Sequence, residues 1–180
     1  MTRLLMPLAS GFEETEAVAV IDVLRRAKIE VVTAAIEDRI VESARKIKIV
    51  ADVILSDIDA SQFDGIVLPG GEPGTTNLEA NNSLKTIITL YAGQDKLIAA
   101  ICAAPRILNG LGILTGKRAT SFPETRSLMA GSLYSEDPVV RDGRYITSRG
   151  VGTALQFGIA IVDYYLGEEE ATRLAAKMLI

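Results

Sequence analysis

Short runs of apolar residues alternate along the chain with longer segments whose apolar positions recur at helical spacing. The runs expected to form buried strands are residues 3–8, 30–35, 64–68 and 97–101. The segments expected to form helices run from about 10 to 26, from 82 to 92, from Pro105 onwards, from 152 to 166 and from 168 to 179. This alternation predicts an α/β sandwich, in which a mostly parallel sheet carries helices on both faces.

Two further stretches predict β-hairpins. An irregular stretch after the second strand contains short candidate strands at 40–42 and 47–51, which we interpret as a small β-hairpin excursion from the main sheet. Later in the chain, residues 139–141 and 144–147 flank Asp142-Gly143, which is the strongest hairpin signal in the sequence.

The expected first helix opens with several acidic residues. Ser10 and Glu13 stand in the S-x-x-E spacing of a capping box, which predicts a helix that starts near Ser10. Glu16 shares a helical stripe with Val20 and can face inward at the end of the first strand, but Glu14 also shares a stripe with apolar residues. Periodicity alone therefore does not choose between these two carboxylates, and both also complement the helix dipole.

The only cysteine, Cys102, lies where the apolar run 97–101 meets the helical segment opened by Pro105. A nucleophile on such a strand-to-helix turn is held at the carboxyl ends of the strands with its side chain exposed. Because the N-terminus of the next helix favours the thiolate, we expect a lowered pKa and a reactive cysteine. A lone cysteine in an apolar run is more often an inert core residue, and its position at the end of a strand is what favours the reactive interpretation.

A glycine-rich loop, P-G-G-E-P-G at residues 69–74, follows the third expected strand. Glycines at the carboxyl end of a strand can bring bare backbone N–H groups close to a ligand, as in an anion-binding nest or an oxyanion hole. The loop lacks the G-x-x-x-x-G-K-[ST] spacing of a nucleotide-binding loop. Taken alone it is weak evidence for a site, because glycines after a strand usually form only a turn.

The composition narrows the possible chemistry. With 180 residues the chain has the usual length of one domain, so we expect a single domain over residues 1–180. It contains no histidine, which removes the commonest general base and the commonest transition-metal ligand. Any catalysis must therefore use the cysteine, carboxylates, Tyr, Lys, Arg or backbone groups, and we expect no metal site.

Charge, hydropathy and cysteine content indicate the cellular compartment and the kinds of partner to expect. The net charge is −4 and no run of Lys or Arg builds a basic stripe, so we expect no obligate nucleic-acid partner. The apolar part of the N-terminus is too short for a signal peptide, and no segment approaches the length of a membrane span. A single cysteine excludes an intrachain disulfide, which suits a reducing compartment. We therefore expect a cytoplasmic protein without a membrane partner.

Four motifs stand in order along the chain: G-F-E-E-T-E-A-V at residues 11–18, D-G-I-V-L-P-G-G at 64–71, A-A-I-C-A-A-P at 99–105 and T-S-R-G-V-G-T at 147–153. With these motifs the sequence resembles the ThiJ/PfpI superfamily over essentially its whole length. It is most similar to the branch that contains the Parkinson-disease-associated protein deglycase and its bacterial YajL-like relatives. The resemblance implies a flavodoxin-like three-layer sandwich, usually a homodimer, that works without a cofactor.

The resemblance also implies roles for the residues in these motifs. Cys102 would be the reactive cysteine, and Glu16, the last glutamate of E-E-T-E, would be the carboxyl group beside its sulfur. The backbone N–H groups of Gly70, Gly71 and Ala103 would donate to a bound oxyanion. This choice of Glu16 comes from the resemblance and not from the helical periodicity.

Other residues receive weaker assignments from the same resemblance. Glu13 would line the pocket, as would Phe122 and Arg149. Phe122 stands where some relatives carry histidine, so that wall of the pocket is apolar, and this argues against an amidase or a peptidase. Arg26 and Arg45 would lie near a dimer interface, but solvated surface charge explains these arginines equally well.

The activities that the resemblance implies are glyoxalase activity, deglycation of early methylglyoxal and glyoxal adducts, chaperoning and the sensing of oxidative stress. We predict an enzyme in which the Cys102 thiolate adds to a small α-oxoaldehyde and Glu16 moves a proton between adjacent carbons. One alternative is an oxidative-stress sensor or redox-regulated chaperone that uses oxidation of the same cysteine. Another is a ligand-binding domain that merely keeps the pocket.

Overall fold

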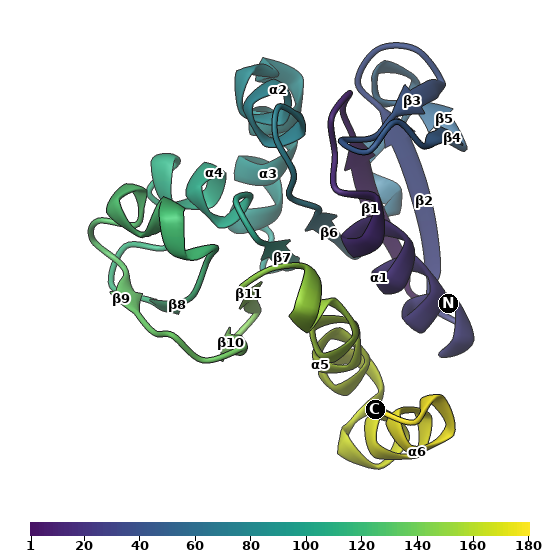
Figure 1. Ribbon diagram of the computed structural model, residues 1–180, viewed down its shortest axis with the longest axis vertical. Helices are drawn as coiled ribbons and strands as arrows, with labels where there is room; N and C mark the ends of the chain where they lie inside the picture. The colour runs from purple at the N-terminus through teal and green to yellow at the C-terminus, as the bar shows by residue number, and fades with distance from the viewer.

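A seven-stranded sheet runs through the centre of the molecule, in a computed structural model that describes residues 1–180 (Figure 1). The strand order is β10-β11-β7-β6-β1-β2-β5. The strands are β1 (Arg3–Leu8), β2 (Glu30–Ala35), β5 (Val53–Ile54), β6 (Gly65–Leu68), β7 (Leu97–Ile101), β10 (Val139–Asp142) and β11 (Tyr145–Ser148). All neighbouring pairs are parallel except β10 and β11, which form the second expected hairpin. The prediction of a mostly parallel sheet is confirmed.

Helices cover both faces of this sheet. They are α1 (Glu14–Arg26), α2 (Gly74–Ala80), α3 (Asn82–Gly93), α4 (Pro105–Gly110), α5 (Ala154–Leu166) and α6 (Glu168–Met178). Figure 1 shows α1, α5 and α6 on one face and α2, α3 and α4 on the other. Successive residues of β1 serve opposite faces, because Leu4 packs in the core that contains Phe157 of α5 and Leu5 in the core that contains Ile88 of α3. The central order β2-β1-β6-β7-β11 is that of flavodoxin-like folds, as expected.

The irregular stretch after β2 forms the expected small hairpin, made of β3 (Ile40–Glu42) and β4 (Lys48–Val50). The sequence did not predict the short edge strand β5 or the helix α2. A further two-stranded sheet pairs β8 (Arg118–Ala119) with β9 (Leu133–Tyr134), away from the main sheet. None of the helices combines the length and the apolar character needed to cross a membrane.

The start of α1 differs from the prediction. The helix begins at Glu14, its N-cap residue is Glu13, and no side chain caps it, so the expected capping box of Ser10 and Glu13 is wrong. Gly11 has φ +86°, and its backbone packs so closely on the glycine-rich loop that a Cβ would lie 2.4 Å from Cδ of Pro73. The N–H of Glu13 donates to the carbonyl of Gly70 at 2.8 Å. This packing between two loops, and not a local cap, sets where the helix starts.

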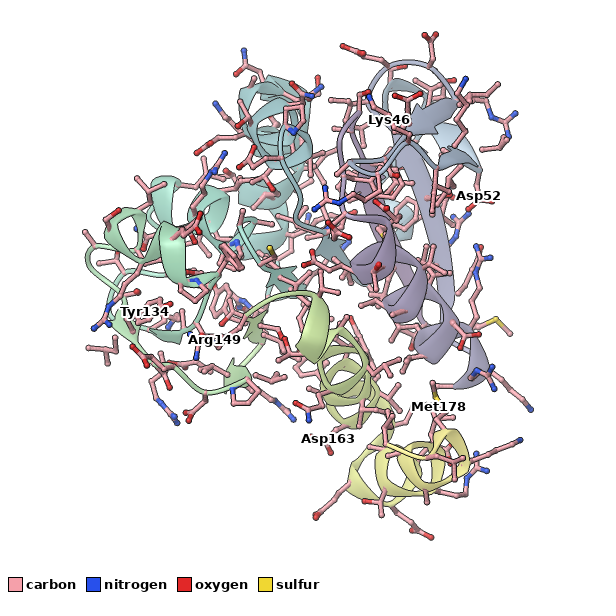
Figure 2. The ribbon with its side chains drawn as sticks, viewed as in Figure 1. Lys46, Asp52, Tyr134, Arg149, Asp163 and Met178 are labelled. Carbon is pink, nitrogen blue, oxygen red and sulfur yellow. The ribbon has the colours of Figure 1, made fainter.

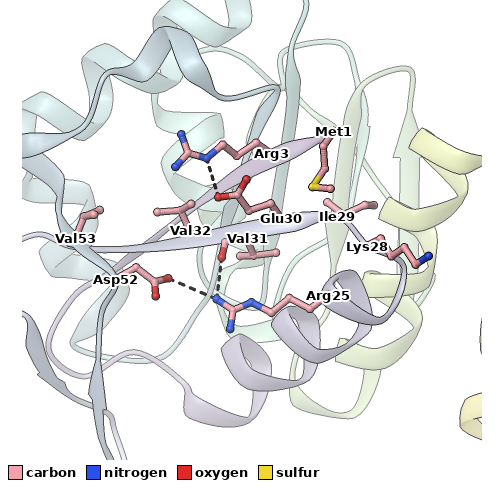
Figure 3. Close-up of a pocket in the computed structure, with 10 residues that line it drawn as sticks. All are labelled: Met1, Arg3, Arg25, Lys28, Ile29, Glu30, Val31, Val32, Asp52 and Val53. Carbon is pink, nitrogen blue, oxygen red and sulfur yellow. Dashed lines mark hydrogen bonds and ion pairs between the residues drawn. The ribbon is translucent and has the colours of Figure 1, made fainter.

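Two side chains form hydrogen bonds with backbone groups on the unpaired edge of β2 (Figure 3). Strand β5 pairs only with the last residues of β2, so the first part of the edge has no neighbouring strand. There Arg25 Nη2 donates to the carbonyl of Val31 at 2.9 Å, and Asp52 Oδ2 accepts from the N–H of Thr33 at 2.9 Å. Arg25 and Asp52 also pair with each other at 3.5 Å. Backbone groups that could pair with a strand of another chain are thereby occupied.

Candidate active site

Cys102 lies on a tight turn between β7 and α4. Its backbone has φ +64°, in the left-handed region, which costs about 1–2 kcal/mol for a residue with a side chain. The N–H of Cys102 donates to the carbonyl of Ser148 at 2.9 Å, and the N–H of Phe122 donates to the carbonyl of Cys102 at 2.7 Å. Neighbouring segments therefore hold the half-buried thiol in a strained turn at the carboxyl end of β7.

Helix α1 places the carboxyl group of Glu16 against this thiol. Glu16 has no exposed surface. Its Oε2 accepts a hydrogen bond from the N–H of Gly70 at 2.9 Å, whereas its Oε1 is buried without a partner. Glu14 points elsewhere and accepts from the N–H of Arg45 at 3.4 Å. Of the two carboxylates that periodicity left open, Glu16 is the one beside the sulfur.

Gly70 is the point at which the two side chains meet. A Cβ at this position would lie 2.5 Å from Cβ of Cys102 and 2.8 Å from Oε2 of Glu16, closer than such atoms approach in proteins. Only glycine fits at this position, because any side chain would collide with Cys102 and Glu16. Its N–H, which we expected to donate to a bound oxyanion, donates to the Glu16 carboxyl in this structure.

Two other backbone donors converge on the sulfur. The N–H groups of Gly71 and Ala103 both donate towards Sγ of Cys102 and lower the pKa of the thiol. Gly71 has φ +91°, and a Cβ there would lie 2.3 Å from the backbone nitrogen of Glu13, so this position requires glycine for two reasons. The pair of N–H groups forms a small nest for negative charge at the sulfur or beside it.

Burial is the largest influence on both ionisable groups. It raises the pKa of the Glu16 carboxyl from 4.5 to about 7, although hydrogen bonds with Gly70 and Cys102 oppose the rise. Burial also raises the pKa of the Cys102 thiol, and the nearby charge of Glu16 raises it further. The expected lowering of the thiol pKa is therefore wrong. Helix α4 spans only Pro105–Gly110, and so short a helix has too weak a dipole to outweigh burial and a carboxylate.

Three separate segments of the chain supply the other residues around Cys102 and Glu16. Glu13 is half-buried, and its charge contributes to the raised pKa of Glu16. Gly150, after β11, is a position that we did not single out from the sequence. A Cβ there would lie 3.5 Å from Cδ2 of Phe122, 3.9 Å from the Cys102 sulfur and 3.9 Å from Oε1 of Glu16. The signal available in the sequence was a glycine two residues after a strand that ends beside the cysteine.

Arg149 is oriented away from the reacting groups. Its Nη1 donates to the carbonyl of Glu136 at 2.8 Å, in the loop before β10, and no hydrogen bond joins it to Cys102 or Glu16 (Figure 2). Arg26 pairs with Asp22 on its own helix at 2.7 Å. The structure thus brings together all the candidate residues around the cysteine except this arginine.

The site combines a thiol, a buried carboxyl oxygen without a partner and two converging N–H groups. When Glu16 is charged, its carboxylate can take the thiol proton as the sulfur attacks an electrophile. The N–H groups can then stabilise negative charge that develops next to the sulfur. No three His, Cys, Asp or Glu side chains are placed to hold a metal ion together. The arrangement suits thiol addition coupled to proton transfer.

The chain is similar to known proteins over nearly its whole length. Residues 2–164 match the sequence model of the DJ-1/PfpI family. The chain is 42% identical over 180 residues to Protein DJ-1 homolog B of Arabidopsis thaliana, which covers 99% of this chain and 41% of that protein. It is 35% identical over 170 residues to the glutathione-independent glyoxalase DJR-1.2 of Caenorhabditis elegans, which covers 93% of this chain and 90% of that protein.

A solved structure is similar over the same length. The oxidized DJ-1 of Toxoplasma gondii superposes with a TM-score of 0.96 at 34% identity, covering 99% of this chain and 98% of that chain. The chain spans less than half the length of the two Arabidopsis relatives, 41% of homolog B and 46% of homolog A.

Proposed function

The chain belongs to the DJ-1/PfpI family, and on that basis we propose that it is a cofactor-free glyoxalase that also removes early methylglyoxal and glyoxal adducts from proteins. The observation that carries the proposal is the completely buried carboxyl group of Glu16 beside the Cys102 thiol, one oxygen of which, Oε1, has no hydrogen-bond partner. A relative named as a glutathione-independent glyoxalase supports the same assignment.

The first step is addition of sulfur to the aldehyde. Sγ of Cys102 attacks the aldehyde carbon of methylglyoxal, while the thiol proton passes to the Glu16 carboxylate. The N–H groups of Gly71 and Ala103 stabilise the oxygen that gains negative charge. This oxygen then takes the proton back from Glu16, which completes a hemithioacetal and restores the carboxylate. Because the thiol is not ionised beforehand, the carboxylate is needed from the outset.

The second step moves hydrogen between carbons. Glu16 removes the proton from the former aldehyde carbon and returns it to the neighbouring carbon through an enediol, so the first carbon is oxidised and the second reduced. The product is a lactoyl thioester of Cys102. Water then hydrolyses the thioester, which releases lactate and restores the thiol. On an early protein adduct the sulfur would displace the amine instead, with the same later steps.

The proposal predicts many turnovers from the protein alone. Freshly reduced wild type, given methylglyoxal without glutathione, is expected to form lactate in large excess over the concentration of chains. The measurement is enantioselective quantification of lactate over time, with heat-unfolded protein as the control for reaction of methylglyoxal with surface arginines and lysines. Lactate formation that stops at one equivalent, or that matches the unfolded control, contradicts the enzyme.

A second candidate is an oxidative-stress sensor or redox-regulated chaperone. Two observations favour it. The single half-buried thiol lies beside a carboxyl group, which when protonated can donate a hydrogen bond to a sulfinate oxygen. The similar DJ-1 structure from Toxoplasma gondii is described as oxidized. One peroxide would convert the thiol to a sulfenic acid and a second to a sulfinic acid, each releasing water. This candidate gains support if two equivalents of peroxide change the capture of an unfolding client protein while aldehyde turnover is absent.

We also propose that the protein is a homodimer. The exposed apolar side chains of Val18 on α1 and of Ile47 and Val50 in the small hairpin support an interface, with exposed fractions of 48%, 53% and 65%. Sedimentation equilibrium is expected to give twice the mass of one chain. Monomers throughout the concentration range, or assemblies larger than dimers, contradict this proposal.

A further inference from the structure

Arg106 joins two segments that face each other across the site. It stands four residues after the cysteine, and only 13% of its side chain is exposed. Its Nη1 pairs with Oε1 of Glu72 at 2.5 Å, its Nη2 donates to Oγ1 of Thr76 at 2.9 Å, and its Nε pairs with Oε2 of Glu79 at 3.1 Å. All three partners belong to the glycine-rich loop or to α2, so this arginine bridges the turn after β7 and the loop after β6.

The two backbone donors at the sulfur come from these same segments. Gly71 belongs to the loop after β6, and Ala103 belongs to the turn after β7. The pairing of β6 with β7 extends only to Leu68 and Ala100, so the sheet does not fix the relative position of the donors. Contacts beyond the sheet must do so.

Glu72 is the contact nearest to a donor, since it follows Gly71 directly in the chain. Its carboxylate is held on two sides. Oε1 pairs with Arg106, and Oε2 accepts a hydrogen bond from Oγ1 of Thr76 at 2.8 Å. A largely buried guanidinium with several partners is a firmer link than an exposed ion pair.

We infer that Arg106 is a positioning residue, which holds the N–H of Gly71 at the Cys102 sulfur through its ion pair with Glu72. Its effect on turnover rests on the function proposed above, whereas its effect on the thiol does not. Glu79 pairs with the same guanidinium from the C-terminal end of α2, several residues from the donor, so its contribution is to the helix and not to the sulfur.

The direction in which each variant shifts the ionisation of the Cys102 thiol distinguishes a positioning role of Arg106 from a direct effect of its charge. The charged groups that face the thiol and its carboxyl, Glu16 and Glu13, are the same in every variant. If only charge mattered, Arg106→Met would disfavour the thiolate and Glu72→Gln would favour it. If position matters, both variants displace the Gly71 N–H and both disfavour the thiolate.

The experiment measures alkylation of Cys102 by iodoacetamide, which reports the only thiol in the chain. At a fixed pH near 8, Arg106→Met and Glu72→Gln are each expected to lower the second-order rate about tenfold. Glu79→Gln and the control Arg126→Met, which breaks an exposed pair with Glu136, are expected to stay within about twofold of wild type. Arg106→Lys is expected to recover part of the rate, because lysine can still pair with Glu72.

Any other pattern overturns the inference, including opposite changes for Arg106→Met and Glu72→Gln or an equal loss for Glu79→Gln. If Arg106→Met does not fold, Glu72→Gln and Arg106→Lys decide the question. With methylglyoxal as substrate, the same two variants are expected to lower kcat about tenfold with KM nearly unchanged. Since alkylation needs no turnover, it tests the inference even if wild type has no glyoxalase activity.

Discussion

Cys102→Ser is expected to lose at least about 10³-fold in kcat for methylglyoxal while keeping the fold. Serine has nearly the same shape, so it can occupy the strained turn and accept from the N–H groups of Gly71 and Ala103. Its hydroxyl is far less acidic than a thiol and a poorer nucleophile, so the adduct with the aldehyde forms too slowly. Lactate production by freshly reduced wild type and variant, under saturating substrate, gives the comparison.

The thermal unfolding midpoint of this variant serves as its control. A midpoint close to that of wild type shows that lost activity reflects the missing sulfur and not a disordered turn. Cys102→Ala provides a second variant without any nucleophile, and its residual rate sets the background. If Cys102→Ser forms lactate as fast as wild type, the sulfur is not the nucleophile and the proposed mechanism fails.

The central strands of the sheet and the place of the cysteine were largely predictable from the sequence. Unbroken apolar runs identified β1, β2, β6 and β7 because strands buried on both faces have no polar side to interrupt them. The hairpin of β10 and β11 followed from Asp-Gly between two strand-like segments. Cys102 was placed correctly because an apolar run ends there and a proline opens a helix soon afterwards.

Features that depend on contacts between distant segments were not predictable. The start of α1 is set by the close packing of Gly11 against the loop at Pro73, which the local spacing of Ser10 and Glu13 does not reveal. Helix α2 was missed because it begins inside a loop rich in glycine and proline and is only one to two turns long. Tertiary packing overrode the local signal in both places.

The ionisation of the site was the largest error, and it has the same origin. The sequence showed a helix after the cysteine, which favours a thiolate. It did not show that α4 is short, that the thiol is half-buried, or that the carboxyl of Glu16 is completely buried beside it. These three facts reverse the expected direction of the thiol pKa, and they are why the proposed mechanism makes Glu16 the acceptor of the thiol proton in addition to its expected role between the carbons.

Glu16→Gln is expected to lower kcat for methylglyoxal by about 10²–10³-fold and to make the protein more stable at alkaline pH. The amide can neither take the thiol proton nor move a proton between carbons. Burial holds the pKa of Glu16 at about 7 in the folded protein, against 4.5 when exposed. The folded state therefore binds the proton more tightly, and wild-type stability falls as the pH rises from about 4.5 to 7.

The rise in pKa corresponds to about 3 kcal/mol of lost stability above pH 7, which glutamine avoids because it carries no charge. In denaturant unfolding, the free energy of unfolding of Glu16→Gln relative to wild type should rise by up to about 3 kcal/mol between pH 5 and pH 8. The matched control Glu169→Gln, at an exposed position of α6, is expected to show no such pH-dependent gain. If Glu16→Gln still forms lactate at the wild-type rate, the carboxylate has no part in the mechanism. If Glu16→Gln is no more stable than wild type at pH 8, burial does not disfavour the charge of Glu16. The carboxylate is thus kept at a cost to the fold, which is expected where a buried charge serves a reaction.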